Sequence, residues 1–267
     1  MTDSTPLRLP PHMARRARDF RGTPAPVRAA ATVVLLRPQD PFEVYVLRRA
    51  TTMAFGGVYA FPGGGVDPAD RPDTVRPDWD VRLGVPAEQA RAIVGAAVRE
   101  LFEEAGVLLA GREQATIGDI GAPDWDADRI AVQNRELTMT ALLDRRGLRL
   151  RDDLLFPWSR WITPEFEPKR FDTWFFVALL PEAQTARDVS GEADRTEWIG
   201  PQAANGLAML PPTRSTLDDL RAYHDVSEVV AASARRDAAA PVLPRVEFTD
   251  DGGAVLHVPK APARPRP

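Results

Sequence analysis

Short runs of hydrophobic and β-branched residues recur along this chain and predict β-strands. Two of them, Ala29–Leu36 and Glu43–Arg49, are separated by a Pro-Gln-Asp-Pro turn, which is typical of strands that pair. Leu154–Trp161 and Phe171–Leu180 are rich in aromatic residues and predict strands as well. Because aromatic strand residues are usually buried, we interpret their tryptophans as core rather than as a surface for stacking a nucleobase. These residues are Trp158, Trp161 and Trp174.

A helical spacing of apolar positions appears between these pairs of strands. The positions that follow it are Ala90, Ile93, Val94, Ala97, Leu101 and Ala105. This spacing predicts a helix from near Pro86, which suits a first helical position, to Ala105, with Gly106 as its C-terminal cap. Gly95 weakens the helix slightly, and we expect it to let another element pack close.

The C-terminal part of the chain carries further helix and strand patterns. Helical spacing predicts one helix over Asp126–Arg146 and another over Pro211–Ala239. Arg195–Ile199 resembles a short strand. Val246–Phe248 and Ala254–Val258 flank an Asp-Asp-Gly-Gly sequence, which predicts a β-hairpin.

Length and composition indicate one large or decorated globular domain. The chain has 267 residues, 44% of them hydrophobic, and a formal charge of −4. It has no cysteine, which excludes a disulfide framework, a thiolate metal site and a cysteine nucleophile. Because no apolar run reaches the length of a membrane span and the N-terminus lacks an apolar signal core, we expect a cytoplasmic protein without a membrane partner.

The two ends differ in composition from the centre. Residues 1–27 are basic and Pro-rich, and we interpret them as an irregular solvated arm. Nucleic acid is not an expected partner, because the chain is acidic and its arginines are not interleaved with aromatic residues. Residues 28–258 are expected to form a single domain, and the Pro-rich residues 259–267 a disordered tail.

Three glutamates lie on one turn of the predicted central helix. Glu100, Glu103 and Glu104 have the spacing i, i+3 and i+4, so they point into one sector next to the apolar stripe. Like charges this close repel each other unless a cation compensates them. Carboxylate oxygens select magnesium, manganese or calcium over zinc. The pattern therefore predicts a phosphate-handling metal site, with Arg99 beside it to orient a carboxylate.

A glycine run precedes this helix. Gly63, Gly64 and Gly65 permit positive φ and close approach of the backbone to a metal or phosphate. Arg48 and Arg49 lie just upstream, where they either meet a substrate phosphate or end a solvated strand.

Together these residues resemble the signature of the Nudix hydrolase family, G-x5-E-x7-R-E-U-x-E-E-x-G-U, with U an aliphatic residue. Gly64 matches the first glycine, Asp70 takes the place of the first glutamate, and Arg99–Val107 match the remainder. Residues 71–98 fill an interval of 28 where the pattern has seven, so 21 residues are extra. This insertion, at about 71–86, is rich in Pro and Asp and predicts a loop ahead of the helix.

Split signatures occur in the branch of the family that resembles acyl-CoA diphosphatases. Trp161–Pro164 and Arg170–Phe176 are also similar to that branch. The resemblance implies an α/β fold, an α/β/α sandwich with a mixed sheet and, here, extra C-terminal helices. It also makes a homodimer an open alternative.

The implied activity is Mg²⁺-dependent hydrolysis, with Mn²⁺ as an alternative ion, of a nucleoside diphosphate linked to another group. CoA or acyl-CoA is the substrate that the branch suggests; ADP-ribose, a dinucleotide or a nucleotide sugar is the alternative. Glu100, Glu103 and Glu104 are the expected ligands, and one of them or Glu192 the base. Glu165 and Glu167 compete with Glu192 for that role. A non-catalytic nucleotide sensor is the rival function, since a fold does not fix a function.

Overall fold

A computed structural model describes residues 4–51, 56–113, 115–191 and 193–264. The strands of its central sheet are β2 Val27–Arg37, β3 Glu43–Arg49, β4 Tyr59–Ala60, β5 Gly63–Gly65, β9 Leu155–Ile162, β10 Arg170–Leu179, β11 Ala193–Ile199 and β12 Pro241–Val242. The order is β11-β3-β2-β10-β9-β12, while β4 pairs with β3 and β5 with β2. β2 and β10 run parallel and β2 and β3 antiparallel, so the sheet is mixed, as expected.

The sheet is buried on both faces, which explains why its central strands are apolar at successive positions. Ala31, Val33 and Leu35 of β2 belong to one core cluster, whereas Val34 and Leu36 belong to the other. Successive side chains of a strand point to opposite faces, so both faces must be covered. The three tryptophans interpreted as core are each at most 4% exposed, which confirms that interpretation.

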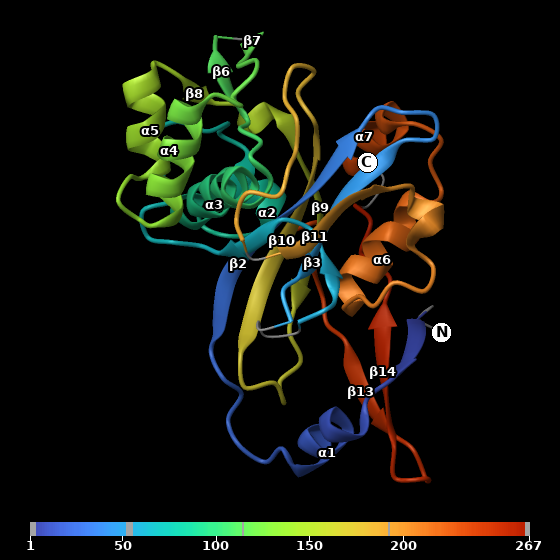
Figure 1. Ribbon diagram of the computed structural model, residues 1–267. Coiled ribbons are helices and arrows are strands. Elements are labelled where there is room, and N and C mark those ends of the chain that lie inside the picture. The colour runs from blue at the N-terminus through green and yellow to red at the C-terminus, as the bar shows by residue number, and fades with distance from the viewer. Residues whose placement is uncertain (1–3, 52–55, 114, 192, 265–267) are drawn as a thin grey trace.

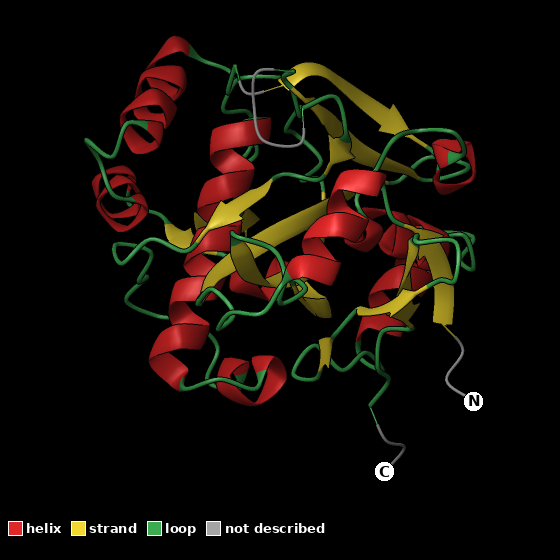
Figure 2. Cartoon of the chain, turned by 90° about the horizontal axis from the view of Figure 1, so that it is seen from below, coloured by secondary structure: helices red, strands yellow, loops and turns green. Residues whose placement is uncertain are grey.

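Helices cover both faces of this sheet and complete an α/β/α sandwich (Figure 1). On one face lie α2 Trp79–Leu83, α3 Ala87–Ala105, α4 Pro123–Gln133 and α5 Met139–Arg146. On the other lie α6 Pro211–Leu220 and α7 Val226–Ser233, while α1 Pro11–Asp19, whose Ala14 belongs to the same core cluster, contacts β13 Arg245–Phe248. Figure 2 shows strands between two groups of helices. The domain also contains a small sheet of β6 Ala110–Arg112, β7 Ala115–Thr116 and β8 Arg149–Leu150, and the short helices η1 Asp152–Leu154 and η2 Pro201–Ala204.

The N-terminal segment is not the irregular arm that its composition predicted. β1 Ser4–Arg8 pairs antiparallel with β14 Ala254–Pro259, which also pairs with β13 Arg245–Phe248 in the predicted hairpin. In α1, Arg16 donates to Glu167 at 2.7 Å, and Arg18 donates to the carbonyl oxygen of Gly252 at 2.8 Å. These arginines therefore attach the segment to the domain.

The Pro-rich tail is ordered as far as residue 264, contrary to prediction. The backbone N–H of Arg264 donates to the carbonyl oxygen of Arg235 at 2.9 Å, and Ala263 forms a β-bridge with Arg236. Backbone pairing after α7 therefore extends the domain beyond residue 258.

Two segments predicted as single helices are each broken into two. Asp126–Arg146 contains the end of α4 and the whole of α5, and the break follows from Arg135, which has φ of 64°. Pro211–Ala239 contains α6 and α7. Asp225 begins α7 by accepting hydrogen bonds from the N–H groups of Ser227 and Glu228. Neither break is marked by glycine or proline.

The insertion also departs from prediction, because it contains α2 and packs into the core. Trp79 and Leu83 are at most 1% exposed, and Trp79 Nε1 donates to Asp152 Oδ2 at 2.6 Å. Gly84 ends α2 with φ of 65°. The segment is a structured part of the domain rather than a surface loop.

Candidate active site

The three predicted glutamates lie at the C-terminal end of α3, next to the glycine strand β5. Glu100, Glu103 and Glu104 are each at most 8% exposed. Gly106 adopts φ of 64° and ends the helix, as predicted. Carboxylates this deeply buried are costly unless hydrogen bonds or cations compensate them, so their partners define the site.

Arg99 joins both halves of the split motif and is itself only 2% exposed. Its Nε and Nη2 donate to the two carboxylate oxygens of Asp70, at 2.7 and 2.9 Å. Nη2 also donates to the carbonyl oxygen of Gly65 at 2.8 Å, and Nη1 donates to Glu100 at 2.7 Å and Glu103 at 3.2 Å. Burial disfavours the charge of Arg99, but these carboxylates outweigh it and raise its pKa. The bidentate pair therefore holds the residue-70 turn against α3.

Gly95 explains how that turn comes so close to the helix. A Cβ atom at this position would lie 2.8 Å from the carbonyl oxygen of Asp70 and 2.9 Å from Pro72 Cδ. The expectation that Gly95 admits a close neighbour is therefore confirmed, and the neighbour is the turn that carries the ion-pair partner of Arg99.

The glycine run permits close approach, without the positive φ also predicted for it. Gly63 donates its N–H to Glu104 Oε2 at 2.9 Å. A Cβ at Gly64 would lie 2.5 Å from Glu100 Oε1, and one at Gly63 would lie 2.6 Å from the carbonyl oxygen of Ala31. The positive-φ glycines of the described chain do not include this run. At residues 63 and 64, therefore, only glycine fits between β2 and the glutamates.

A second arginine, which the sequence did not point to, reaches the acidic cluster from the turn after α4. Arg135 Nη1 donates to Glu103 Oε1 at 2.5 Å, and its Nε lies 3.7 Å from Asp67 Oδ2. The Arg135 side chain is 46% exposed, whereas that of Glu103 is 7% exposed. No motif surrounds Arg135, so only the packing of α4 beside α3 reveals its place.

The electrostatics of the cluster favour an additional cation. Burial raises the pKa of Glu100 to about 7, although the charge of Arg99 lowers it and that of Glu103 raises it further. A carboxyl group with this pKa is poorly compensated as an anion. A cation beside it would stabilise its charged form.

The donor atoms fit Mg²⁺ or Mn²⁺ in kind, because all three glutamates offer oxygen. As the side chains stand, no group of three or more His, Cys, Asp or Glu residues within the described ranges is arranged to hold a metal ion. Glu100 and Glu103 face Arg99, Glu103 also faces Arg135, and Glu104 accepts from Gly63. Shared coordination therefore requires at least one of these contacts to change.

Other predicted site residues lie elsewhere or cannot be placed. Arg48 pairs with Asp194 of β11, at 2.7 Å, while the Arg49 N–H donates to the carbonyl oxygen of Val58. Glu167, one of the two alternatives to Glu192 as the base, is paired with Arg16 of α1. Glu192 lies outside the described residues, so its assignment stays a prediction.

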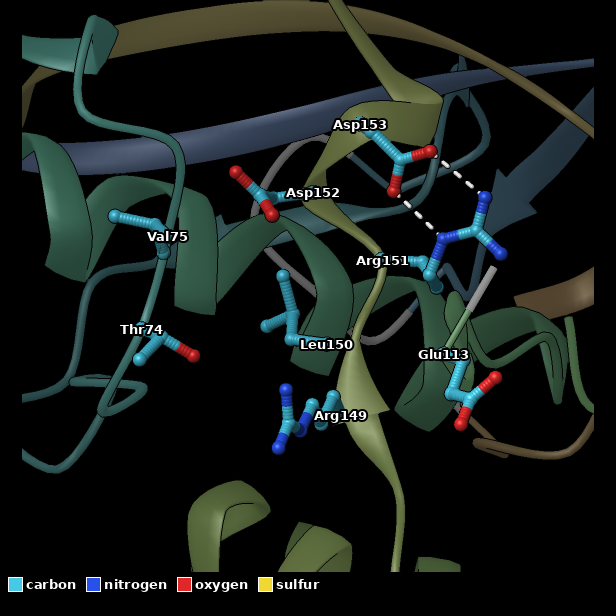
Figure 3. Close-up of a pocket in the computed structure, with 8 residues that line it drawn as sticks. All are labelled: Thr74, Val75, Glu113, Arg149, Leu150, Arg151, Asp152 and Asp153. Carbon is cyan, nitrogen blue, oxygen red and sulfur yellow. Dashed lines mark hydrogen bonds and ion pairs between the residues drawn. The ribbon is translucent and has the colours of Figure 1, made fainter. Parts of the chain in front are cut away.

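A pocket of about 240 Å³ lies beside the insertion and the small sheet, and it shares no residue with the split motif. Figure 3 shows its lining, in which the Arg151 side chain pairs with Asp153. Thr74 and Val75 come from the insertion, and the other lining residues are Glu113, Arg149, Leu150 and Asp152. The acidic cluster is therefore separate from this pocket.

A glycine strand and a glutamate-bearing helix, joined by one buried arginine inside an α/β/α sandwich, define the Nudix class of proteins. The chain belongs to the Nudix hydrolase family. A family model described as the NUDT19 Nudix domain matches residues 76–208, which include α3 and its glutamates.

Among individual proteins, the chain is similar to putative nudix hydrolase 7 of Caenorhabditis elegans, with 30% identity over 191 residues, covering 69% of this chain and 57% of that protein. It is 28% identical over 216 residues to human acyl-coenzyme A diphosphatase NUDT19, covering 62% of this chain and 56% of that protein. The chain thus spans a little over half the length of these curated relatives.

A solved NUDIX hydrolase from Alicyclobacillus acidocaldarius has the same fold, with a TM-score of 0.64 and 28% identity over 78% of this chain and 96% of that one. Within the described residues, no helix is both long enough and apolar enough to cross a membrane.

Proposed function

We propose that this protein is a Mg²⁺-dependent diphosphatase that hydrolyses a nucleoside diphosphate joined to another group. Arg99 carries the proposal, because its bonds to Asp70, Gly65, Glu100 and Glu103 reunite two half-motifs that 21 extra residues separate in sequence. A structural helix with an incidental acidic face has no need for this buried network.

Glu100, Glu103 and Glu104 are the proposed ligands of the divalent ion, and Mn²⁺ is the alternative ion. When bound, such an ion neutralises phosphate charge and lowers the pKa of bound water. Arg99 orients Glu100 and Glu103, while the Gly63 N–H fixes the carboxylate of Glu104. One of these glutamates, or Glu192, serves as the base.

CoA or acyl-CoA is the proposed substrate, and the named activity of the human relative supports it. The 3′-phosphate of CoA needs a cation to distinguish it. Arg170 already donates to the carbonyl oxygens of Ala25 and Thr163, and Arg48 is held by Asp194, so neither cation is directed at the acidic cluster. ADP-ribose, a dinucleotide or a nucleotide sugar remains the alternative substrate.

The test is a substrate panel with Mg²⁺ that covers CoA, acyl-CoA, ADP-ribose, dinucleotides and nucleotide sugars, with products identified by mass. We expect 3′,5′-ADP and a phosphopantetheine product from CoA or its ester. Cleavage of another member alone would refute the CoA assignment but not the diphosphatase. Binding without cleavage of any member would favour the sensor.

Glu103→Gln and Glu104→Gln are the matched variants, because each removes one charge with little change of shape. We expect turnover to fall by about 10²-fold or more while the thermal midpoint in EDTA stays near that of the parent protein. A variant that keeps the parent kcat at saturating Mg²⁺ would show that its glutamate is not a ligand.

A further inference from the structure

Arg135 contacts the acidic cluster in a manner that conflicts with ion binding. Its Nη1 lies 2.5 Å from Glu103 Oε1, on one of the proposed ligands. A guanidinium group and a divalent ion that share one carboxylate repel each other over a few ångströms. The ion and the guanidinium group therefore compete for Glu103.

The Arg135 side chain is able to leave this position. It is 46% exposed, so its charged group can reach water without the cost of opening the core. Arg99, by contrast, is 2% exposed and is held by a bidentate ion pair with the buried Asp70. Arg99 is thus the permanent partner of Glu103, and Arg135 the exchangeable one.

The backbone at Arg135 is held in a conformation that a side chain disfavours. Its φ of 64° lies in the left-handed region, where glycine or asparagine is preferred. Its N–H donates to the carbonyl oxygen of Val132 at 3.0 Å, and the N–H of Glu136 donates to that of Ala131 at 2.9 Å. This turn ends α4 and would suit glycine, so an arginine here carries a backbone cost that its side chain must offset.

We propose that Arg135 is a built-in counter-ion that neutralises Glu103 in the free protein and moves to a phosphate of the substrate when a divalent ion takes its place. The proposal rests on the proposed function. Phosphate oxygens, like carboxylate oxygens, can accept two hydrogen bonds from one guanidinium group, so the arginine can exchange Glu103 for a phosphate. Ion binding and diphosphate binding then reinforce each other, and the coupling is reciprocal.

The test measures Mn²⁺ affinity of the purified full chain by electron paramagnetic resonance, with Mn²⁺ alone and with imidodiphosphate, a diphosphate that is not hydrolysed. We expect Arg135→Asn to bind Mn²⁺ alone roughly tenfold more tightly than the parent protein, because the competing cation is gone. Imidodiphosphate should tighten Mn²⁺ binding more in the parent protein than in the variant. A residue that only clamps α4 to α3 predicts the opposite sign, since its loss would loosen the ion site.

Three variants control for charge, backbone and folding. Arg135→Lys keeps the positive charge, so its affinity for Mn²⁺ should stay near that of the parent protein. Arg135→Gly removes the charge and also the cost of the positive φ, and its affinity for Mn²⁺ should match that of Arg135→Asn. Glu113→Gly relieves the other positive φ of a non-glycine residue in the described chain, at 53°, and should leave Mn²⁺ affinity unchanged. Thermal midpoints in EDTA verify that each variant is folded.

The outcomes separate this inference from the proposed function. Equal or weaker Mn²⁺ binding in Arg135→Asn and Arg135→Gly overturns the inference, while loss of Mn²⁺ binding in Glu103→Gln still supports the ion site. Absence of Mn²⁺ binding from the parent protein and every Arg135 variant overturns both. Mn²⁺ binding unchanged in Glu103→Gln shows that the ion does not use Glu103, and it also overturns the inference.

Discussion

At the scale of single residues, Gly64 and Gly65 offer a matched pair for testing how tightly the backbone approaches the glutamates. A Cβ at Gly64 would lie 2.5 Å from Glu100 Oε1, whereas one at Gly65 meets no atom within 4 Å. Gly64→Ala must push aside a carboxylate that Arg99 holds, so we expect kcat to fall about 10²-fold with a loss of stability near 1 kcal/mol. Gly65→Ala should change kcat and stability little. Equal activity of the two variants would contradict the close approach.

Glu100 makes the stability of the ion-free protein depend on pH. Burial raises its folded pKa to about 7 from 4.5, so its contribution to stability is fully present below pH 4.5 and lost as pH rises through 7. The raised pKa corresponds to a loss of about 3 kcal/mol in the free energy of unfolding.

The measurement for Glu100 is urea unfolding of the parent protein and Glu100→Gln in EDTA, at pH 5 and pH 8. From pH 5 to pH 8 we expect the free energy of unfolding of the variant to rise relative to that of the parent protein, because glutamine does not ionise. A difference between the two proteins that is the same at both pH values would show that Glu100 is compensated as an anion.

Sequence reasoning pointed to most residues of the candidate site and missed how their side chains are held. Glu100, Glu103, Glu104 and Arg99 follow from spacing on one helix, which needs no tertiary information. The contact of Arg135 with Glu103 does not, because it depends on where a separate helix ends. Burial of the carboxylates also depends on every element that covers them, so the raised pKa of Glu100 could not be predicted from the sequence.

At the scale of elements, α2 makes the insertion part of the core and gives it a measurable share of stability. Trp79 is 1% exposed, packs edge-to-face on Phe176 at 5.9 Å between ring centroids, and donates to Asp152. We expect Trp79→Ala to cost about 3–5 kcal/mol, measured by urea unfolding. Val81, on the same helix and 73% exposed, provides the control, because Val81→Ala should be nearly neutral. An equal loss in the free energy of unfolding for Trp79→Ala and Val81→Ala would contradict the packing of α2 into the core.

The strands were predicted closely, and the helices outside the motif were not. β3 has the predicted bounds, and β2, β9 and β10 differ from theirs by one or two residues, because two-sided burial leaves continuous apolar runs. The break at Arg135 lacks the glycine that usually marks a helix end, so Asp126–Arg146 was predicted as one helix. The proline-rich composition of the insertion likewise concealed α2, whose stability comes from packing rather than helix propensity.

At the scale of the whole molecule, the sandwich came from a resemblance to a family, since composition and periodicity alone do not order strands in a sheet. The same reasoning gave an irregular N-terminal arm, because the basic residues there suggested a solvated chain. In the structure β1 completes a separate sheet with β13 and β14. Within the described residues β1 pairs with β14 alone, which begins at Ala254, and local patterns do not reveal such a distant pairing.

That pairing has a consequence for synthesis on the ribosome. The strand Ser4–Arg8 emerges before its partner, which begins at Ala254, 254 − 8 = 246 residues later. At typical elongation rates of about 5–20 residues per second, the interval is roughly 12–50 s. Ser4–Arg8 is therefore made long before it can pair, and throughout that time it offers an unpaired strand to nascent-chain chaperones or to copies of this chain on the same message.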